Sequence, residues 1–337
     1  MNEQTMFGIF KKLLIINLCL FTVVFVSCTG EIETRTSDYS ASYADPVAYL
    51  MNAVRTNNLP TVIRFIEEGV EDVDVQDEYG RTALMHAAKN GRLLIAEYLI
   101  QKNADLLIED RWDYTAEQYA WENEYRDVVD LILHHTPDLN SKGVWGETPL
   151  HKSICWFYPD ITTWLMKQGV ELDTPDKNGL SALMMSIRCF DRTIFERLLN
   201  AGADPDLQDQ DGNTALHFAV AYYRPKAIKT LLNHGSRVDL LNNDDQTALM
   251  LAVEHEYLEL IEPFAEYGKD LDLKNNKGET ALIQAIYDKQ FEIASLLVEN
   301  GASLYIENHQ GKSAMKLASE TWSVDSAKQL QAAAPNE

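Results

Sequence analysis

The side chains best suited to chemistry form an acidic run at residues 204–212, in which four Asp residues precede Gly212. A calcium-binding EF-hand loop has oxygen ligands at alternate positions and ends on a bidentate Glu at its twelfth residue. Leu207 interrupts the alternation, and the closing Glu is missing. We therefore interpret the run as turn-forming residues, because Asp and Gly favour tight turns, and we expect no metal site there.

Histidines and catalytic motifs give no sign of a metal centre or an active site. The sequence has eight His residues, of which His134 and His135 are adjacent. It has neither an HExxH motif nor a Cys/His quartet with zinc-ligand spacing. It also lacks a GxSxG nucleophile motif, a P-loop and a glycine-rich dinucleotide fingerprint. We expect no cofactor and no enzymatic activity.

The chain of 337 residues is strongly acidic, with 52 Asp and Glu against 29 Lys and Arg and a formal net charge of −23. Such a charge repels the phosphate backbone of nucleic acids and the headgroups of anionic lipids. Nucleic-acid binding is therefore excluded as a function, and a protein partner is expected to present a basic patch. The content of 46% hydrophobic residues is that of a globular chain.

The first thirty residues have the layout of a secretion signal. Two lysines precede an apolar run at residues 13–26, which is too short to span a bilayer comfortably. The run ends in Phe-Val-Ser before Cys28, and this ending resembles the lipobox of bacterial lipoproteins. The resemblance implies that residues 1–27 are removed and that Cys28 is lipidated. An ordinary signal peptide and an uncleaved N-terminal anchor are the alternatives.

A polar segment follows the cysteine. Residues 29–42 are rich in Thr, Ser and Glu, so we expect residues 28–45 to form a lipidated Cys and a flexible tether. The lipoprotein resemblance implies a location in the cell envelope, on a bacterial membrane, with the folded part in the periplasm or outside the cell. Thr29 is not the Asp associated with retention in the inner membrane, so the resemblance favours the outer membrane.

Residues 46–332 are organised by a 33-residue repeat. A motif of the form Gly-x-Thr-Ala-Leu-x-x-Ala recurs, and its Thr or Ser is here called the anchor. The anchors are Thr82, Thr115, Thr148, Ser181, Thr214, Thr247, Thr280 and Ser313. Seven equal intervals do not arise by chance, and a fixed period of this length indicates a stack of similar structural units.

Each repeat is predicted to contain two helices. The Thr or Ser anchor is a favoured helix N-cap, and a small residue five positions later permits close approach of another helix. A second apolar stripe, such as Ile95, Tyr98 and Leu99, has the spacing of an amphipathic helix. A glycine in the left-handed conformation is expected to end this second helix. These glycines are Gly69, Gly169, Gly202, Gly235, Gly268 and Gly301.

The units resemble ankyrin repeats. The matching segments are Thr148-Pro149-Leu150-His151, Thr214-Ala215-Leu216-His217 and Gly202-Ala203-Asp204. The third unit departs from the pattern, with Thr115-Ala116-Glu117 and with Thr136-Pro137 where Gly is expected. The resemblance implies an all-α solenoid of about nine helix-turn-helix units with β-hairpin-like loops. The units are expected near residues 46–79, 80–112, 113–145, 146–178, 179–211, 212–244, 245–277, 278–310 and 311–332.

Two cysteines fall near the ends of first helices in neighbouring units. A disulfide between Cys155 and Cys189 would be compatible with an oxidising compartment. Stacked helices lie about 8–10 Å apart, whereas a disulfide needs Cα atoms within about 7 Å. We therefore favour two free thiols and keep the disulfide as the alternative.

Aromatic residues are concentrated in the third to sixth units. The resemblance implies a contact surface made of loop tips and the outer ends of first helices, and exposed Trp, Tyr and Arg often dominate the energy of protein interfaces. The candidate partner-binding residues are Tyr79, Arg81, Arg111, Trp112, Tyr114, Trp145, Trp156, Tyr222 and Tyr287. The alternative is that these side chains pack between neighbouring units and only stabilise the stack.

The resemblances and the charge together predict a membrane-anchored protein that binds a protein partner through its concave face and loop tips. Rigid repeats limit the entropy lost on binding. We expect a monomer that touches the membrane through its lipid anchor alone. The alternative function is an envelope component that inhibits or stabilises a neighbouring secreted enzyme or toxin, or that acts as a structural spacer.

Overall fold

The computed structural model describes residues 45–68, 72–189, 191–267 and 270–334. All of them belong to the second of the chain's two units, Asp45–Glu337. The predicted signal peptide, Cys28, almost all of the predicted tether, Gly69 and Gly268 lie outside the described residues.

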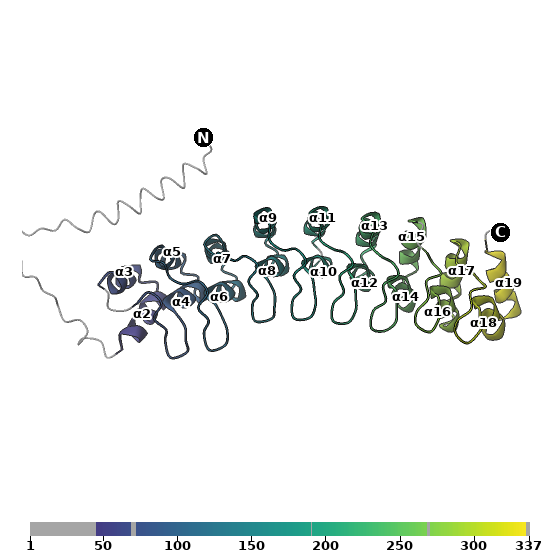
Figure 1. Cartoon of the computed structure of the whole chain (residues 1–337), viewed down its shortest axis with the longest axis horizontal. Helices are drawn as coiled ribbons and strands as arrows, with labels where there is room; N and C mark the ends of the chain where they lie inside the picture. The colour runs from purple at the N-terminus through teal and green to yellow at the C-terminus, as the bar shows by residue number, and fades with distance from the viewer. Residues whose placement is uncertain (1–44, 69–71, 190, 268–269, 335–337) are drawn as a thin grey trace, which may run out of the picture. The chain divides into compact units, whose positions relative to one another are not determined.

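The described residues fold into pairs of α-helices, as Figure 1 shows. The first helices of the pairs are α2 (Pro46–Arg55), α4 (Ala83–Lys89), α6 (Ala116–Glu122), α8 (Pro149–Cys155), α10 (Ala182–Arg188), α12 (Ala215–Ala221), α14 (Ala248–Glu254), α16 (Ala281–Tyr287) and α18 (Ala314–Thr321). The second helices are α3 (Leu59–Glu67), α5 (Leu93–Gln101), α7 (Arg126–Leu133), α9 (Pro159–Gln168), α11 (Arg192–Asn200), α13 (Pro225–Asn233), α15 (Leu258–Glu266), α17 (Phe291–Glu299) and α19 (Val324–Ala332). The predicted all-α fold of paired helices is confirmed.

The anchors define the starts of the first helices. All eight are the N-cap residues of α4, α6, α8, α10, α12, α14, α16 and α18. In seven of them the side-chain oxygen accepts a hydrogen bond from the backbone N–H of the third helical residue. At the other end of a pair, Gly169 caps α9 with a φ of 79°. This left-handed conformation is the one predicted for the helix-ending glycines.

The apolar core lies inside each pair and between neighbouring pairs. Each first helix packs against its own second helix, and most first helices also pack against the first helix of the next unit. The small residue five positions after the anchor, such as Ala87 or Ala120, is completely buried, which lets helices approach closely. Among the described first helices, the neighbours α6 and α8 are in the loosest contact.

The loops between units project on the side of the first helices (Figure 1). An Asp or Asn five residues before the anchor closes most loops, because its side-chain oxygen accepts backbone N–H bonds from residues two and four positions later. These residues are Asp77, Asp110, Asp176, Asp209, Asn242, Asn275 and Asn308. In the loop that precedes the anchor Thr148, the same position is Gly143. Asp209 of the acidic run therefore has a structural role.

No helix in the described part of the chain is both long and apolar enough to cross a membrane.

Candidate binding surface

Three consecutive loops carry an exposed aromatic residue three positions before the anchor. Tyr79, Trp112 and Trp145 are 42%, 50% and 66% exposed. Because the position is the same in each unit, the three rings lie at equivalent points of successive loops. The next two units have Asn178 and Asp211 there. The loops that precede Thr82, Thr115 and Thr148 are thus not interchangeable with the rest, and aromatic exposure is restricted to one part of the stack at this position.

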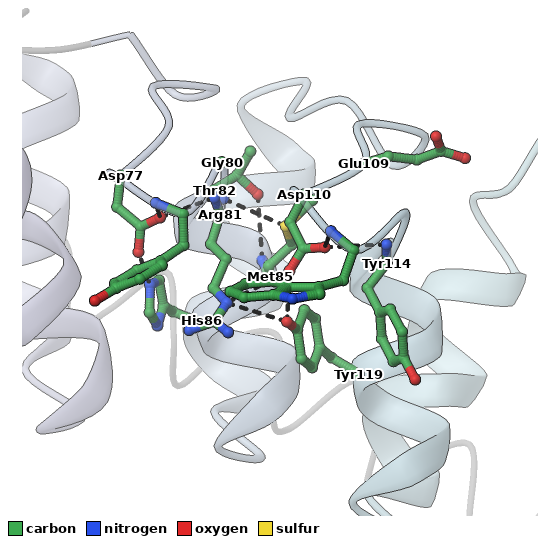
Figure 2. A network of polar contacts seen from close by, with 12 residues as sticks. Asp77, Gly80, Arg81, Thr82, Met85, His86, Glu109, Asp110, Tyr114 and Tyr119 are labelled. Carbon is green, nitrogen blue, oxygen red and sulfur yellow. Dashed lines mark hydrogen bonds and ion pairs between the residues drawn. The ribbon is translucent and has the colours of Figure 1, made fainter. Parts of the chain in front are cut away.

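The first two of these rings stack on each other with centroids 6.0 Å apart, and a guanidinium group lies beside both. The Arg81 Cζ atom lies 5.3 Å from the ring centroid of Tyr79, 5.0 Å from that of Trp112 and 5.6 Å from that of Tyr119. Its Nε donates to the Tyr119 hydroxyl at 3.0 Å and lies 3.4 Å from Oδ2 of Asp110. Figure 2 shows Arg81 between Asp110 and Tyr119. The structure therefore places Arg81 in packing between neighbouring units.

Asp110 connects this cluster to its loop. Its side chain is fully buried beside Arg81, and Tyr119 donates its hydroxyl proton to Oδ2 at 2.6 Å. Burial raises the pKa of Asp110. The hydrogen bond from Tyr119 and the backbone N–H bonds of its own loop lower the pKa by more than burial raises it, so the net pKa is below the usual range. Burial, together with the bond to Asp110, raises the pKa of Tyr119 to about 12. At neutral pH the pair is a carboxylate and a neutral phenol.

Three histidines are buried between loops and helices. His86 Nε2 lies 2.8 Å from Oδ2 of Asp77 (Figure 2). His151 and His217 each place Nε2 3.0 Å from a backbone carbonyl of the next unit. Burial lowers the pKa of all three imidazoles. Within the described ranges, no three His, Cys, Asp or Glu side chains lie close enough together to hold a metal ion.

A cavity of about 200 Å³ lies where α6 and α8 are in loose contact. It is lined by Tyr114, Gln118, Trp121, Glu122, Val144, Trp145, Glu147, Lys152 and Trp156. Three of the predicted site residues, Tyr114, Trp145 and Trp156, therefore meet in one place. The ring centroids of Tyr114 and Tyr119 are 5.4 Å apart and the ring planes are tilted by 45°, so the side chains that line this cavity contact the Arg81 cluster.

A buried ion pair adjoins the cavity through Lys152, one of the lining residues. Glu117 takes the position two residues after the anchor at which six units have Leu. Its Oε1 accepts a bond from Trp121 Nε1 at 2.7 Å and lies 3.4 Å from Lys152 Nζ. The side chains of Glu117 and Lys152 are only 10% and 7% exposed. The charge of Lys152 is therefore compensated within the protein by Glu117.

Gly143 makes room for this polar group. A Cβ atom at Gly143 would lie 3.0 Å from Gln118 Nε2, 3.1 Å from Lys152 Nζ and 3.2 Å from Glu147 Oε1. The Asp or Asn of the other loops would not fit at this point without displacing these side chains. The loop also lacks the backbone bond to the loop before it. Arg111 N donates to Tyr79 O at 3.1 Å and Lys177 N donates to Trp145 O at 2.9 Å. Among the described residues no such bond joins the Trp112 loop to the Trp145 loop, and none joins Asp244 to Asn276.

The cavity has an excess of negative charge. Tyr114 donates its hydroxyl to Glu122 Oε1 at 2.6 Å, and this bond, followed by burial, raises the pKa of Tyr114 to about 12. Glu147 Oε2 is buried and has no hydrogen-bond partner among the described residues. A buried carboxylate oxygen without a donor is unfavourable, so a ligand donor that reaches it when the neighbouring side chains move aside would be stabilising.

The remaining three predicted residues are not part of the ring contacts around Arg81 or of the cavity lining. Arg111 is exposed on the loop beside Trp112, and its backbone N donates to Tyr79 O at 3.1 Å. Tyr222 is 40% exposed and stacks on Phe218 at 6.1 Å. Tyr287 is also 40% exposed, and its hydroxyl accepts a bond from Asn308 Nδ2 at 3.3 Å. The structure therefore brings six of the nine predicted residues into one connected surface and leaves these three outside it.

Several residues of the cavity were missed by the sequence analysis. Trp121, Gly143, Glu147 and Lys152 were not among the predicted site residues, and Glu117 was noted only as a departure from the repeat pattern. The signal that would have found two of them was present in the sequence. Glu117 stands where six units have Leu, and Gly143 stands where seven have Asp or Asn.

The two described cysteines are free thiols that lie close together. Cys155 Sγ and Cys189 Sγ are 3.8 Å apart, although the helix spacing suggested a larger separation. The bond from Cys155, together with the nearby positive charge of Arg188, lowers the pKa of Cys189 to about 7, against the opposing effect of burial. The geometry thus agrees with free thiols and also leaves the two sulfurs within reach of each other.

A larger hollow lies away from the loops. Its volume is about 530 Å³, and its lining is contributed by α11, α13 and neighbouring residues, including Phe195, Pro225 and Ala227. None of the predicted binding residues lines it.

The repeated helix pairs and the surface built on their loops define a helical-repeat binding protein. A family model described as ankyrin repeats (3 copies) matches residues 50–143, 118–209, 189–275 and 249–336. These matches cover most of the chain, which therefore belongs to the ankyrin-repeat family and is a protein–protein interaction module. No curated protein matches the chain by sequence.

Proposed function

We propose that this protein is tethered to a bacterial membrane by lipidated Cys28 and holds a basic protein partner on the surface formed by the loops that precede Thr82, Thr115 and Thr148. The observation that carries the binding part is the exposure of Tyr79, Trp112 and Trp145 at one register position of successive loops. Large aromatic side chains with exposed faces gain more from burial in an interface than most residues do.

Charge supports the choice of partner. The chain has a net charge of −23, and the exposed residues around the aromatic positions include Glu78, Asp113 and Glu122. Complementary charge accelerates association and disfavours acidic competitors. The partner is accordingly a protein with a basic patch, and the complex weakens as salt is raised.

The test is crosslinking in native cells, followed by identification of the captured protein and binding measurements with both purified proteins. Trp112, Trp145 and Trp156 are changed together to Ala. The matched control changes Asp211, Asp244 and His255 to Ala, at the equivalent positions of later units. We expect the first variant to lose the partner and the control to keep it, with far-UV circular dichroism unchanged in both. Equal capture by the two variants would refute the aromatic surface.

The anchor has its own test. A Cys28→Ala variant and the parent are labelled in cells with a palmitate analogue and separated into membrane and soluble fractions. We expect lipid label and membrane association in the parent alone. Label that persists in the variant, or a parent that remains in the soluble fraction, would contradict a lipid anchor at Cys28.

A further inference from the structure

We propose that the cavity between α6 and α8 receives the guanidinium group of an arginine side chain presented by the protein partner. This inference rests on the proposed function and names the chemical group that the surface recognises. It is carried by three observations: aromatic walls, uncompensated carboxylates, and a buried acceptor atom without a donor.

The walls are aromatic. Tyr114, Trp121, Trp145 and Trp156 all line the cavity. The faces of Trp and Tyr rings attract cations, and Trp does so most strongly. Trp145 is 66% exposed, so its indole is free to cover a side chain that enters from the surface. Trp121 is held in place by the bond from its Nε1 to Glu117.

The charge of the cavity is suited to a cation. Glu122 and Glu147 both line it, and the only cationic side chain among its lining residues is Lys152. Lys152 Nζ already lies 3.4 Å from the buried carboxylate of Glu117. Two lining carboxylates are thus left without a compensating charge from the described residues that line the cavity. An anionic ligand would have to approach both of them.

The unpartnered oxygen selects among cations. Glu147 Oε2 is buried without a hydrogen-bond donor among the described residues. A quaternary ammonium group has no N–H to offer and would leave this oxygen unsatisfied. A lysine ammonium donates, but it is a compact and strongly hydrated charge. A guanidinium group donates in its plane, stacks on aromatic faces and is weakly hydrated, so it satisfies both the walls and the acceptor.

Gly143 and Glu117, which depart from the repeat pattern, also favour the binding of a cation in the cavity. Gly143 leaves the space that Gln118, Lys152 and Glu147 occupy, and Glu117 supplies the charge that neutralises Lys152. Without Glu117, the Lys152 ammonium would repel an incoming cation. The ion pair is therefore a positioning element of the cavity, and the ligand contacts are assigned to the aromatic rings and to Glu147.

The test uses blocked tripeptides in which the central residue is arginine, citrulline, lysine or trimethyllysine. Citrulline is close in shape to arginine but has no charge. Binding to the whole folded protein is measured by calorimetry and by quenching of tryptophan fluorescence. We expect the arginine peptide to bind about tenfold or more tightly than the citrulline peptide, with the lysine and trimethyllysine peptides weaker than arginine.

Two variants test the assigned contacts. Glu147→Gln keeps the shape and removes the charge, and Trp145→Ala removes an exposed ring, so neither is expected to disturb the fold. Each should weaken arginine-peptide binding about tenfold. The matched controls are Glu279→Gln and Gln310→Ala at the same register positions of later units, where Glu279 Oε2 already has a partner, Asn275. The controls should bind as the parent does.

The outcomes separate the two proposals. Equal binding of the arginine and citrulline peptides, or full binding by Glu147→Gln, would overturn the guanidinium site. If no tripeptide binds while the triple tryptophan variant still loses its partner, the proposed docking surface stands and the guanidinium site in the cavity is overturned. If the arginine peptide binds as expected but the triple variant captures the partner normally, the cavity binds a guanidinium group but receives none from this partner, and the proposed docking surface falls.

Discussion

Replacing Lys152 with Met tests whether the buried ion pair stabilises the junction between α6 and α8. Methionine keeps an unbranched, largely apolar side chain of similar length, so the change is mainly the loss of charge. The carboxylate of Glu117 is then buried without a cation, at a position where its side chain is 10% exposed. Breaking a buried pair in this way costs about 3–5 kcal/mol. Because the two atoms are 3.4 Å apart and a cavity adjoins them, we expect the lower end, about 3 kcal/mol.

The double variant Glu117→Gln/Lys152→Met separates the charge effect from packing. Gln retains an oxygen that accepts the bond from Trp121 Nε1, and no buried charge remains. We expect the free energy of unfolding to return to within about 1 kcal/mol of the parent value, because neutral replacement of a whole buried pair is often harmless.

The assay is urea unfolding followed by circular dichroism and tryptophan fluorescence, with each transition fitted separately, because repeat arrays can unfold in segments. Lys229→Met is the matched control, since its partner Glu266 forms an exposed ion pair, and exposed pairs contribute little to stability. The reasoning is wrong if Lys152→Met is no more destabilising than this control, or if the double variant is as unstable as the single one.

Three further predictions concern groups outside this pair. Arg81→Ala should lower the free energy of unfolding by about 2 kcal/mol, because the stacked guanidinium and its charged bond are lost; Arg81→Lys should recover only part of it in urea unfolding. Burial lowers the folded-state pKa of His151 and His217 from the usual 6.5. The unfolded chain therefore binds more protons, and stability is expected to fall as the pH drops below about 6.5. A His151→Gln/His217→Gln variant should show a smaller loss between pH 7 and pH 5 in thermal unfolding. Glutathione disulfide should oxidise Cys155 and Cys189 to an intramolecular disulfide, with release of two glutathione thiols, because the sulfurs are 3.8 Å apart and the pKa of Cys189 is about 7. Mass spectrometry of the intact protein should show the loss of two hydrogens, and Cys155→Ser should abolish it.

Most of the fold could be predicted because each local signal repeats. A Thr or Ser at a fixed interval predicts a helix start by its capping chemistry alone, and all eight anchors fulfil this role. The loop aspartates could also be interpreted correctly, since turn chemistry depends on residues within four positions of each other. Asp209 accepts its two loop bonds from Asp211 and Asn213.

The binding surface was harder to predict because it depends on contacts between units. Register alone indicated that Trp112 and Trp145 face outward, and both are exposed. Register did not show that Arg81 is held by rings from the next unit. Helix spacing favoured two free thiols, and both cysteines are free. It did not show how close the sulfurs lie, because side chains at helix ends can converge when the helix axes do not. The sulfurs of Cys155 and Cys189 are close although each lies on a different helix pair.

The position of the cavity within the stack has a physical reason. Glu117 in place of an apolar residue, Gly143 in place of a loop-closing side chain, and the missing loop bond each weaken the contact between the third and fourth units. In a repeat array a unit contacts only its neighbours, so the cost of such departures stays local and the well-packed units on either side sustain the fold. Residues that break a local rule without stabilising the fold are expected at functional sites. The loop bond is also missing between Asp244 and Asn276, so it does not set this junction apart. The other two departures, Glu117 and Gly143, meet beside one cavity, while the units with anchors from Ser181 to Thr280 keep the apolar residue and the loop-closing Asp or Asn. That coincidence distinguishes a binding site from scattered drift in a repeat sequence, where the departures would fall in different units and would not share a cavity.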